Sequence, residues 1–222
     1  MRYLNKFVVI LFVLLASFES AVTRADELFT SEIPSTAWPH VGPAANPNIT
    51  NGELAFNFAS MYAVQWGMYI LTQRETIADH GSFNNWATNW CQPHFDNDTF
   101  QYNIFKHSIV GQGYYQFYRS RGYELKKAFL WAFASSLAFE MAIETTTEKP
   151  SLQDIYQTPV YGTILGIGLE KVSQACHRTE TALGHICGYI LDPFTLLPSS
   201  PKFAMYPEIS HDKFVANVSW VY

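Results

Sequence analysis

Four long apolar segments with helical periodicity constrain the fold of this chain more than any other feature. Along the second segment, His107, Gly111 and Tyr114 begin one broad face, because residues three or four apart share a side of a helix. Gly122 stands where a glycine commonly ends a helix, and Lys149-Pro150 stops the third segment. The sequence therefore predicts a mainly α fold, a compact bundle of about four apolar helices over residues 53–74, 104–121, 124–146 and 152–175.

The fourth segment carries its own start signal and a stripe of small residues. Ser151 and Asp154 have the spacing of a capping box, with Asp in place of Glu. We expect an interruption of this helix at Thr158-Pro159. Beyond it, small residues would let another helix approach closely, at Gly162, Gly166 and Gly168. Residues 75–103 are expected to form an ordered loop with one short helical turn.

The C-terminus ends in alternating apolar residues, a pattern typical of a β-strand: Phe214, Ala216, Val218, Trp220 and Tyr222. A terminal aromatic of this kind is also how the last strand of an outer-membrane barrel ends, and the alternative is a hairpin packed on the helices. The expected organisation is a signal peptide at 1–25, an extended lead-in at 26–52, a helical core domain at 53–197, and a connector with a C-terminal β-strand at 198–222.

The first 25 residues have the form of a bacterial signal peptide. Arg2 and Lys6 precede an apolar run from Phe7 to Ala16, which is shorter than the roughly 20 residues that a spanning helix needs. We therefore expect cleavage after Ala25 and export to the periplasm, in association with the outer membrane. The alternative is an uncleaved anchor.

Composition narrows the class of protein. Charged residues make up 15% and aromatic residues 16%, which indicates much buried or lipid-facing surface. A net charge of −5 gives no basis for nucleic-acid binding. Cys176 and Cys187 are the natural disulfide pair in an oxidising compartment, with Cys91 left over. The alternative is three free thiols, and no cysteine or histidine spacing indicates zinc.

Several ionisable residues lie on or beside these apolar helices, and burial of an unpaired carboxylate is costly. Glu140 and Glu144 are one turn apart and share a face. One interpretation is structural, with a glutamate accepting hydrogen bonds from His107, Arg119 or tyrosine hydroxyls. The second is a catalytic or metal site, and the third a ligand pocket without chemistry. The candidate catalytic residues are His107, Glu140, Glu144 and Asp154, although no HExxH, GxSxG or phosphate-binding loop is present.

A basic turn follows the second segment. It carries four positive charges within nine residues, at Arg119, Arg121, Lys126 and Lys127. Such a cluster would meet anionic lipid headgroups, and the alternative is an ordinary solvated turn.

A series of short motifs resembles an uncharacterised family of exported bacterial proteins, known only as a domain of unknown function. The motifs that carry the resemblance lie between Phe83 and Leu197: Phe83 to Trp90, His107-x-x-x-Gly111, Tyr114-Tyr115, Arg119-x-Arg121-Gly122, Ser136, Glu140, Glu144, Glu148 to Asp154, Thr158-Pro-x-x-Gly162-x-x-x-Gly166 and Asp192-Pro193. The resemblance implies an envelope protein, often with β-structure after a helical core, and no activity. One departure is that the family often has Gly-Glu where this chain has Gly166-Ile167, with Glu170 coming later.

The sequence favours a cell-envelope accessory protein that binds lipid or a membrane partner. The first alternative is an envelope hydrolase or metal-dependent enzyme that uses the His107, Glu140, Glu144 and Asp154 cluster. The second is an inner-membrane helical protein. The cofactor, substrate and oligomeric state stay open.

Overall fold

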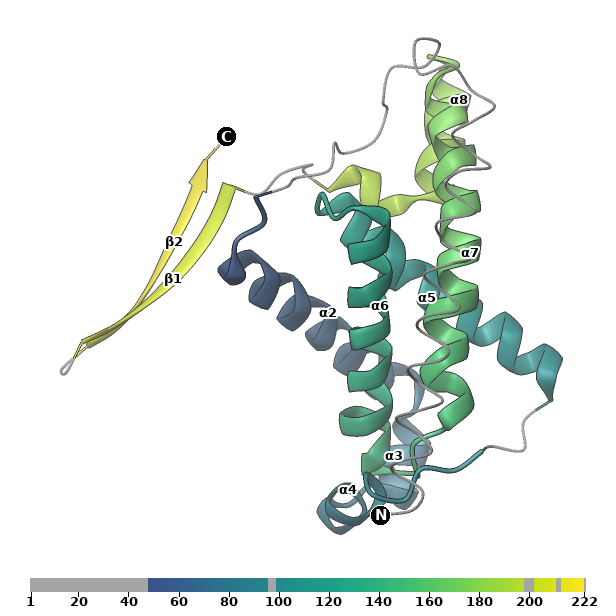
Figure 1. Ribbon diagram of the computed structural model, residues 1–222, viewed down its shortest axis with the longest axis vertical. Coiled ribbons are helices and arrows are strands. Elements are labelled where there is room, and N and C mark those ends of the chain that lie inside the picture. The colour runs from purple at the N-terminus through teal and green to yellow at the C-terminus, as the bar shows by residue number, and fades with distance from the viewer. Residues whose placement is uncertain (1–47, 96–98, 198–201, 211–212, 222) are drawn as a thin grey trace. The chain divides into compact units, whose positions relative to one another are not determined.

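The computed structural model describes residues 48–95, 99–197, 202–210 and 213–221. These residues are mainly helical, as the sequence predicts (Figure 1). The predicted signal peptide and nearly all of the predicted lead-in lie outside the described residues. Within those residues, no helix combines the length and the hydropathy needed to cross a membrane.

The four predicted helices correspond to α2, α5, α6 and α7. The bounds of all described helices are α2 (Asn51–Thr72), α3 (Arg74–His80), α4 (Phe83–Asn89), α5 (Phe100–Ser120), α6 (Leu125–Ala138), α7 (Leu152–His177) and α8 (Ala182–Leu191), with short 3-10 turns η2 (Glu144–Thr146) and η3 (Pro193–Leu196). The loop expected over 75–103 contains most of α3 and all of α4, and α8 was not expected.

The predicted helix ends are largely confirmed. Helix α2 begins at Asn51, shortly before the predicted start at residue 53, after a complete capping box of Thr50 and Glu53 that was not predicted. Gly122 has a φ of 84°, the left-handed conformation that a glycine adopts after a helix without steric cost. The expected interruption at Thr158-Pro159 is wrong, because α7 runs unbroken through Pro159. Although a proline removes one backbone hydrogen bond, the packing of α5 against this part of α7 holds the helical path.

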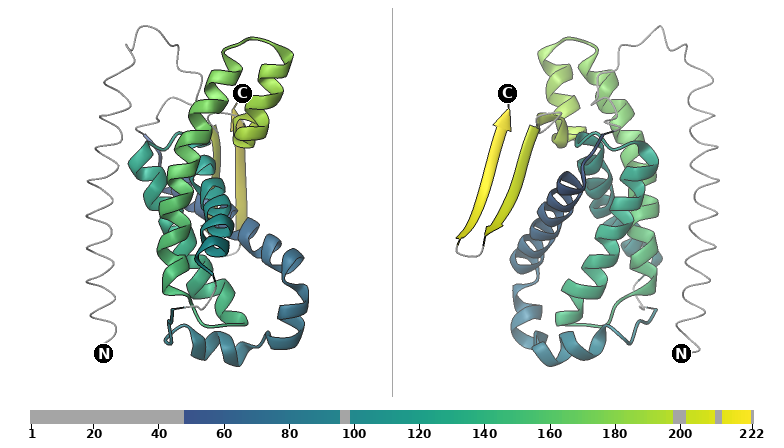
Figure 2. Two further views of the ribbon diagram at one scale, coloured as in Figure 1. Left: turned by 90° about the vertical axis from the view of Figure 1, so that its right-hand side faces the viewer. Right: turned by 60° about the vertical axis from the view of Figure 1, so that its left-hand side comes forward.

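Helices α5 and α7 lie side by side in both views of Figure 2 and share the most extensive helix contact among the described residues. The backbones nearly touch at Gly111 and Gly162. A Cβ atom on Gly162 would lie 2.3 Å from the Cα of Gly111, and one on Gly111 would lie 1.8 Å from the carbonyl oxygen of Thr158. Gly166 faces the ring of Tyr115, whereas Gly168 faces open space. The predicted close approach is therefore confirmed at two of the three glycines.

The hydrophobic core lies where α5 packs against α6, with Met61 of α2 added to it. Tyr115, Tyr118 and Tyr123 are buried there together with Ala128 and Ala132. The Tyr118 hydroxyl lies 2.8 Å from the Ser135 Oγ, so the polar end of this ring is satisfied inside the core. The alanines let the helices approach the tyrosine rings.

The helix that begins as α6 changes its winding before it ends. Phe139–Ile143 forms a π-helical turn, and η2 follows it. A π-turn inserts one residue into the helical repeat and re-aims the side chains on it, which is why such turns are frequent at functional sites. Glu140 lies on this turn and Glu144 directly after it.

Strands β1 (Lys202–Ser210) and β2 (Lys213–Val221) pair antiparallel, with Phe203 opposite Trp220. The interpretation of the last strand as part of an outer-membrane barrel stays a prediction.

The contact of α5 with α7 yields a first prediction. Gly162→Ala should lower the free energy of unfolding by about 2–3 kcal/mol, because the added methyl group overlaps the backbone of α5. The matched control is Gly168→Ala on the same helix, which should raise stability by about 0.5–1 kcal/mol, since it meets no atom and removes a helical glycine. Urea denaturation measures both, and equal effects would contradict the close contact.

Candidate functional site

A cavity of about 560 Å³ lies between α2 and α5 and is bounded also by the end of α6, by α7 and by the segment around η3. Its wall is mostly apolar, and several of these side chains are exposed, so the cavity opens to solvent. On α5 the lining residues run from Lys106 to Phe117, which is about 16 Å along the helix axis. The apolar lining residues are Met61, Val64, Met68, Ile109, Val110, Phe117, Phe139, Phe194 and Leu197.

Ionisable groups line the cavity where α5 begins. Lys106 and His107 come from the first turns of α5, and Glu140 and Glu144 come from the end of the α6 segment. Burial raises the pKa of Glu144, and the charge of Lys106 opposes this rise. The cavity therefore has a polar end beside Lys106 and an apolar end beside Phe117 and Phe194.

Glu140 and Glu144 form a carboxylic acid pair at the polar end. The two side chains are hydrogen-bonded to each other. Burial raises the pKa of Glu140 well above its usual range, and the charge of Glu144 adds to this effect. Burial also raises the pKa of Glu144, to about 7, while the hydrogen bond from Glu140 opposes the rise. The pair therefore holds a proton near neutral pH.

The Glu140 carboxyl has a second partner. Its Oε2 accepts a hydrogen bond from the backbone N–H of Ser151 at 3.1 Å. This bond stabilises the ionised form and ties the π-turn to the first residues of α7. Of the two glutamates, Glu140 is the more deeply buried, with 2% of its surface exposed.

His107 lies between a hydroxyl and a carboxylate. Its Nδ1 is 2.8 Å from the Oγ1 of Thr158, and its Nε2 is 3.2 Å from Oδ1 of Asp154. All three side chains are buried, and both partners come from α7. The carboxylate that the structure sets beside His107 is thus that of Asp154, whereas the structural interpretation of the sequence paired His107 with a glutamate.

The capping box at the start of α7 is only half formed, and the reason connects it to this site. The Ser151 Oγ accepts from the backbone N–H of Asp154 at 3.3 Å, as predicted. The return bond is replaced, because the Ser151 N–H donates to Glu140 and the Asp154 carboxylate faces His107. Ser151 and Asp154 therefore do more than cap the helix, because Ser151 contacts Glu140 and Asp154 contacts His107.

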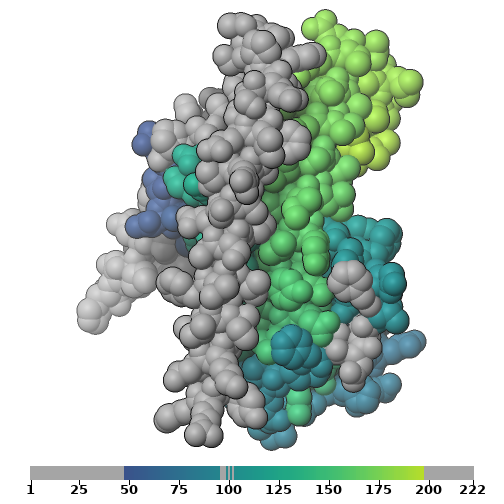
Figure 3. Space-filling view, turned by 45° about the vertical axis from the view of Figure 1, so that its right-hand side comes forward, coloured from purple at the N-terminus to yellow at the C-terminus, as the bar shows by residue number. Residues whose placement is uncertain are grey.

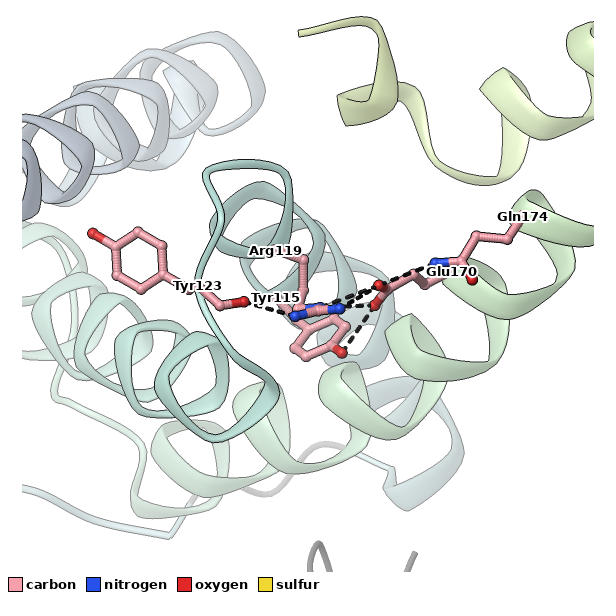
Figure 4. A network of polar contacts seen from close by, with 5 residues as sticks. All are labelled: Tyr115, Arg119, Tyr123, Glu170 and Gln174. Atoms are coloured by element: carbon pink, nitrogen blue, oxygen red, sulfur yellow. Dashed lines mark hydrogen bonds and ion pairs between the residues drawn. The ribbon is translucent and has the colours of Figure 1, made fainter. Parts of the chain in front are cut away.

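Arg119 lies in a polar network with Glu170 (Figure 4). Its guanidinium binds both carboxylate oxygens of Glu170, the closest contact being 2.8 Å, and donates to the backbone oxygen of Tyr123 at 2.7 Å. The Tyr115 hydroxyl donates to Glu170 at 3.0 Å. Arg119 thus has an internal partner, so its position favours a structural role over contact with headgroups.

The other three basic residues of the turn differ in their surroundings. Arg121 donates from Nε to Asn57 at 3.0 Å. Lys126 and Lys127 are exposed, and Lys127 is 3.8 Å from Glu124. Contact with anionic headgroups stays a prediction, and the exposure of Lys126 and Lys127 suits it best.

The structure brings the predicted cysteine pair together. The sulfur atoms of Cys176 and Cys187 are 3.4 Å apart, and both residues are free thiols in this structure. Beside them, Nδ1 of His177 is 3.0 Å from Nδ1 of His185, a contact that the sequence analysis missed. Within the described part of the chain, no group of three or more His, Cys, Asp and Glu residues is arranged to hold a metal ion.

Sequence reasoning also missed Lys106, Thr158 and the contribution of α2 to the site. Thr158 follows Asp154 by four residues, so the two share a helix face, and this spacing was a usable signal. Lys106 had no patterned partner. The part played by α2 depends on which face of that helix meets α5, and its nearly uniform apolar sequence does not mark one face.

Comparison with known proteins agrees with the family resemblance. Residues 92–194 match the model of a family described as a domain of unknown function (DUF3943). The resemblance to an uncharacterised family is thereby confirmed, and the matched range contains His107, Glu140, Glu144, Asp154 and Thr158. No curated protein and no solved structure is significantly similar to the chain.

The acid pair leads to a prediction about pH. A carboxyl whose pKa is raised in the folded state binds its proton more tightly there, so folding is favoured at low pH and loses stability as pH rises from about 4.5 to about 7. Glu144→Gln should remove the share of this loss that Glu144 contributes, while the buried Glu140 keeps its own, and should be more stable than the wild type at pH 8 by about 2–3 kcal/mol.

Urea denaturation at pH 5 and pH 8 measures the effect. The control is Glu124→Gln, which alters an exposed carboxylate at the start of α6 and should keep the wild-type pH dependence. If Glu144→Gln and the wild type lose stability equally between the two pH values, the pair does not hold a proton in the folded state.

Proposed function

We propose that this chain, whose residues 92–194 match a domain of unknown function, is a cell-envelope accessory protein that holds a lipid-like, amphipathic molecule in the cavity between α2 and α5. The observation that carries the proposal is the cavity itself, an open apolar wall that ends at a small cluster of ionisable groups. An amphipathic ligand has the same division along its length.

The apolar wall suits a flexible chain. The cavity has a volume of about 560 Å³, which falls within the roughly 300–1,000 Å³ typical of small-molecule sites. Met61 and Met68 supply unbranched side chains that adapt to irregular ligands. Val64, Met68 and Ile109 remain 48–58% exposed, so covering them would remove apolar surface from water. That burial is the driving force that we assign to binding.

The polar end suits a single headgroup. Lys106 offers a cation and a donor, while the acid pair offers both a donor and acceptors when it holds one proton. One proton on the pair leaves one negative charge, Glu148 adds another close to Glu144, and the charge of Lys106 partly offsets them. We therefore assign the headgroup to the class that both donates and accepts hydrogen bonds, such as a carboxylic acid, an alcohol or an amine.

Two observations support a place in the envelope. The leader-like first 25 residues favour export. In addition, α4 and the residues after it expose aromatic side chains of the kind that are enriched at membrane interfaces, namely Phe83, Trp86, Trp90 and Phe95. A membrane or a membrane protein is accordingly the partner that we propose.

Gly113 allows a sharp test of the cavity. It lines the cavity, and a Cβ atom added there meets nothing within 4 Å. Gly113→Leu should therefore fill ligand space without disturbing the fold, and weaken binding of a dansyl-labelled fatty acid by at least about tenfold, which corresponds to 1.4 kcal/mol. Fluorescence titration measures the affinity.

Gly168→Leu is the matched control, since Gly168 is also a helical glycine with open space but lies outside the cavity lining. It should bind the fatty acid as the wild type does. Wild-type affinity in Gly113→Leu, or no binding by the wild-type protein, would contradict the proposal.

The contacts of His107 favour one second candidate, an envelope hydrolase. The Thr158 hydroxyl, the His107 imidazole and the Asp154 carboxylate lie in series, as a nucleophile, base and orienting acid do in hydrolytic triads. Both Thr158 and His107 line the cavity, so an ester in the ligand would be within their reach. The same contacts also pin α5 to α7, which is the structural interpretation.

Thr158→Val separates these two interpretations, because it removes the hydroxyl and keeps the shape of the side chain. If the chain hydrolyses esters, turnover of a p-nitrophenyl acyl ester should fall at least about a hundredfold in both Thr158→Val and His107→Gln, while circular dichroism shows an intact fold. Equal turnover in the wild type and both variants would dismiss the hydrolase.

A further inference from the structure

The helices α7 and α8 form a hairpin whose two arms each carry a cysteine. We propose that Cys176 and Cys187 form a reversible disulfide that fixes α8 and η3 in place and so rigidifies one wall of the cavity. Formation of the crosslink does not depend on the proposed function. Only the effect of the crosslink on ligand binding rests on the proposed function. Both thiols are partly exposed, so a small oxidant can reach them.

Close packing sets the register that brings the two thiols together. The Ser173 hydroxyl on α7 donates to the backbone oxygen of Gly188 on α8 at 2.9 Å. A Cβ atom on Gly188 would lie 2.4 Å from the ring of His177, and one on Gly184 would lie 2.5 Å from the backbone oxygen of Cys176. Because neither glycine leaves room for a side chain, α8 cannot slide along α7 without losing these contacts.

Aromatic contacts hold the same register. The ring centroids of His177 and Tyr189 lie 4.7 Å apart in an edge-to-face arrangement, and Nδ1 of His185 contacts Nδ1 of His177. Figure 3 shows the α8 region (yellow-green) against the C-terminal part of α7 (green) on the face drawn. The 3.4 Å separation of the two sulfur atoms is therefore a consequence of the hairpin packing.

The hairpin continues directly into the cavity wall. The backbone N–H of Phe194 in η3 donates to Oδ1 of Asp192, which follows α8, at 3.2 Å. The Phe194 ring lies 5.8 Å from that of Phe117, and both line the cavity. Gln116 on α5 donates to the backbone oxygen of Leu191 at 3.1 Å. Displacement of α8 would therefore disturb the apolar end of the cavity.

The chemistry is a thiol–disulfide exchange with a small-molecule disulfide as oxidant. One cysteine thiolate attacks a sulfur of the oxidant, forms a mixed disulfide and releases one thiol. The second cysteine then attacks the protein sulfur of that mixed disulfide, forms the Cys176–Cys187 bond and releases the second thiol. Two protein thiols are oxidised and one oxidant disulfide is reduced to two thiols. A disulfide holds its sulfurs about 2.05 Å apart, so the 3.4 Å separation shortens when the bond forms.

A peptide map tests the crosslink. Trypsin cuts after Lys171, Arg178 and Lys202, so the two cysteines fall in separate peptides, 172–178 and 179–202. The full chain with Cys91→Ser is treated with oxidised glutathione, alkylated and digested without reduction. We expect the two peptides to appear joined, at a mass two hydrogens below their sum, and to separate after reduction.

Amide hydrogen exchange tests the clamp. In the oxidised protein, amides of α8 and η3 should exchange at least about tenfold more slowly than in the reduced protein, because the crosslink suppresses local opening. The variant that carries both Cys91→Ser and Cys187→Ser is the control, and oxidant should leave its exchange unchanged. Stable glutathione adducts instead of joined peptides, or equal exchange in both redox states, would overturn the proposal.

Titration with the dansyl-labelled fatty acid separates this proposal from the proposed function. If the clamp rigidifies the cavity wall, the affinity for the fatty acid should change between the reduced and oxidised forms of the Cys91→Ser protein by at least about threefold. Binding of equal strength in both forms overturns the effect on the cavity. Absence of binding in both forms, with joined peptides and slowed exchange, refutes the fatty-acid site and leaves the clamp supported.

Discussion

The contact between α5 and α7 at Gly111 and Gly162 is the constraint on which the rest of the structure depends. Because neither residue has a side chain, the two backbones meet and the neighbouring side chains are forced together. His107, one turn before Gly111, therefore reaches Thr158 and Asp154 on α7. The same approach carries α7 unbroken past Pro159, and further along it sets Glu170 beside Arg119. One steric condition thus organises the contacts of His107 and the pair of Arg119 with Glu170.

The pair of Glu140 and Glu144 depends on a balance between the cost of burying two carboxyl groups and the gain from a shared proton. Two carboxyl groups held together in a poorly solvated position cost free energy, and a shared proton reduces that cost. A merely stable bundle would place apolar side chains there, since a well-packed apolar core is no less stable than a buried polar cluster. The π-turn that carries Glu140 is a second unusual feature at the same place, because it departs from regular α-helix. Both lie beside a solvent-open apolar cavity, and this coincidence is the basis on which we propose a ligand there.

Arg119 and Glu170 show what a local sequence pattern leaves open. A basic cluster in the turn after the second helical segment suggested contact with lipid headgroups, but the guanidinium of Arg119 points back to α7. Glu170 stands four residues after Gly166, where the family resemblance left the role of an acidic group in doubt. In this chain it is the partner of Arg119 and of the Tyr115 hydroxyl. Its position one turn beyond Gly166 places it on the face of α7 that meets α5.

The sequence by itself determined the helical class, the four long helices and most of their ends, because periodicity, Gly122 and the caps act within a few residues of one another. It also singled out the glycine stripe and the candidate residues His107, Glu140, Glu144 and Asp154. The tertiary structure decided which of them meet. The pairing of His107 with Asp154 and Thr158, the cavity between α2 and α5, and the meeting of His177 with His185 join residues on different helices. Such contacts depend on the rotation and offset of packed helices, which no local pattern specifies.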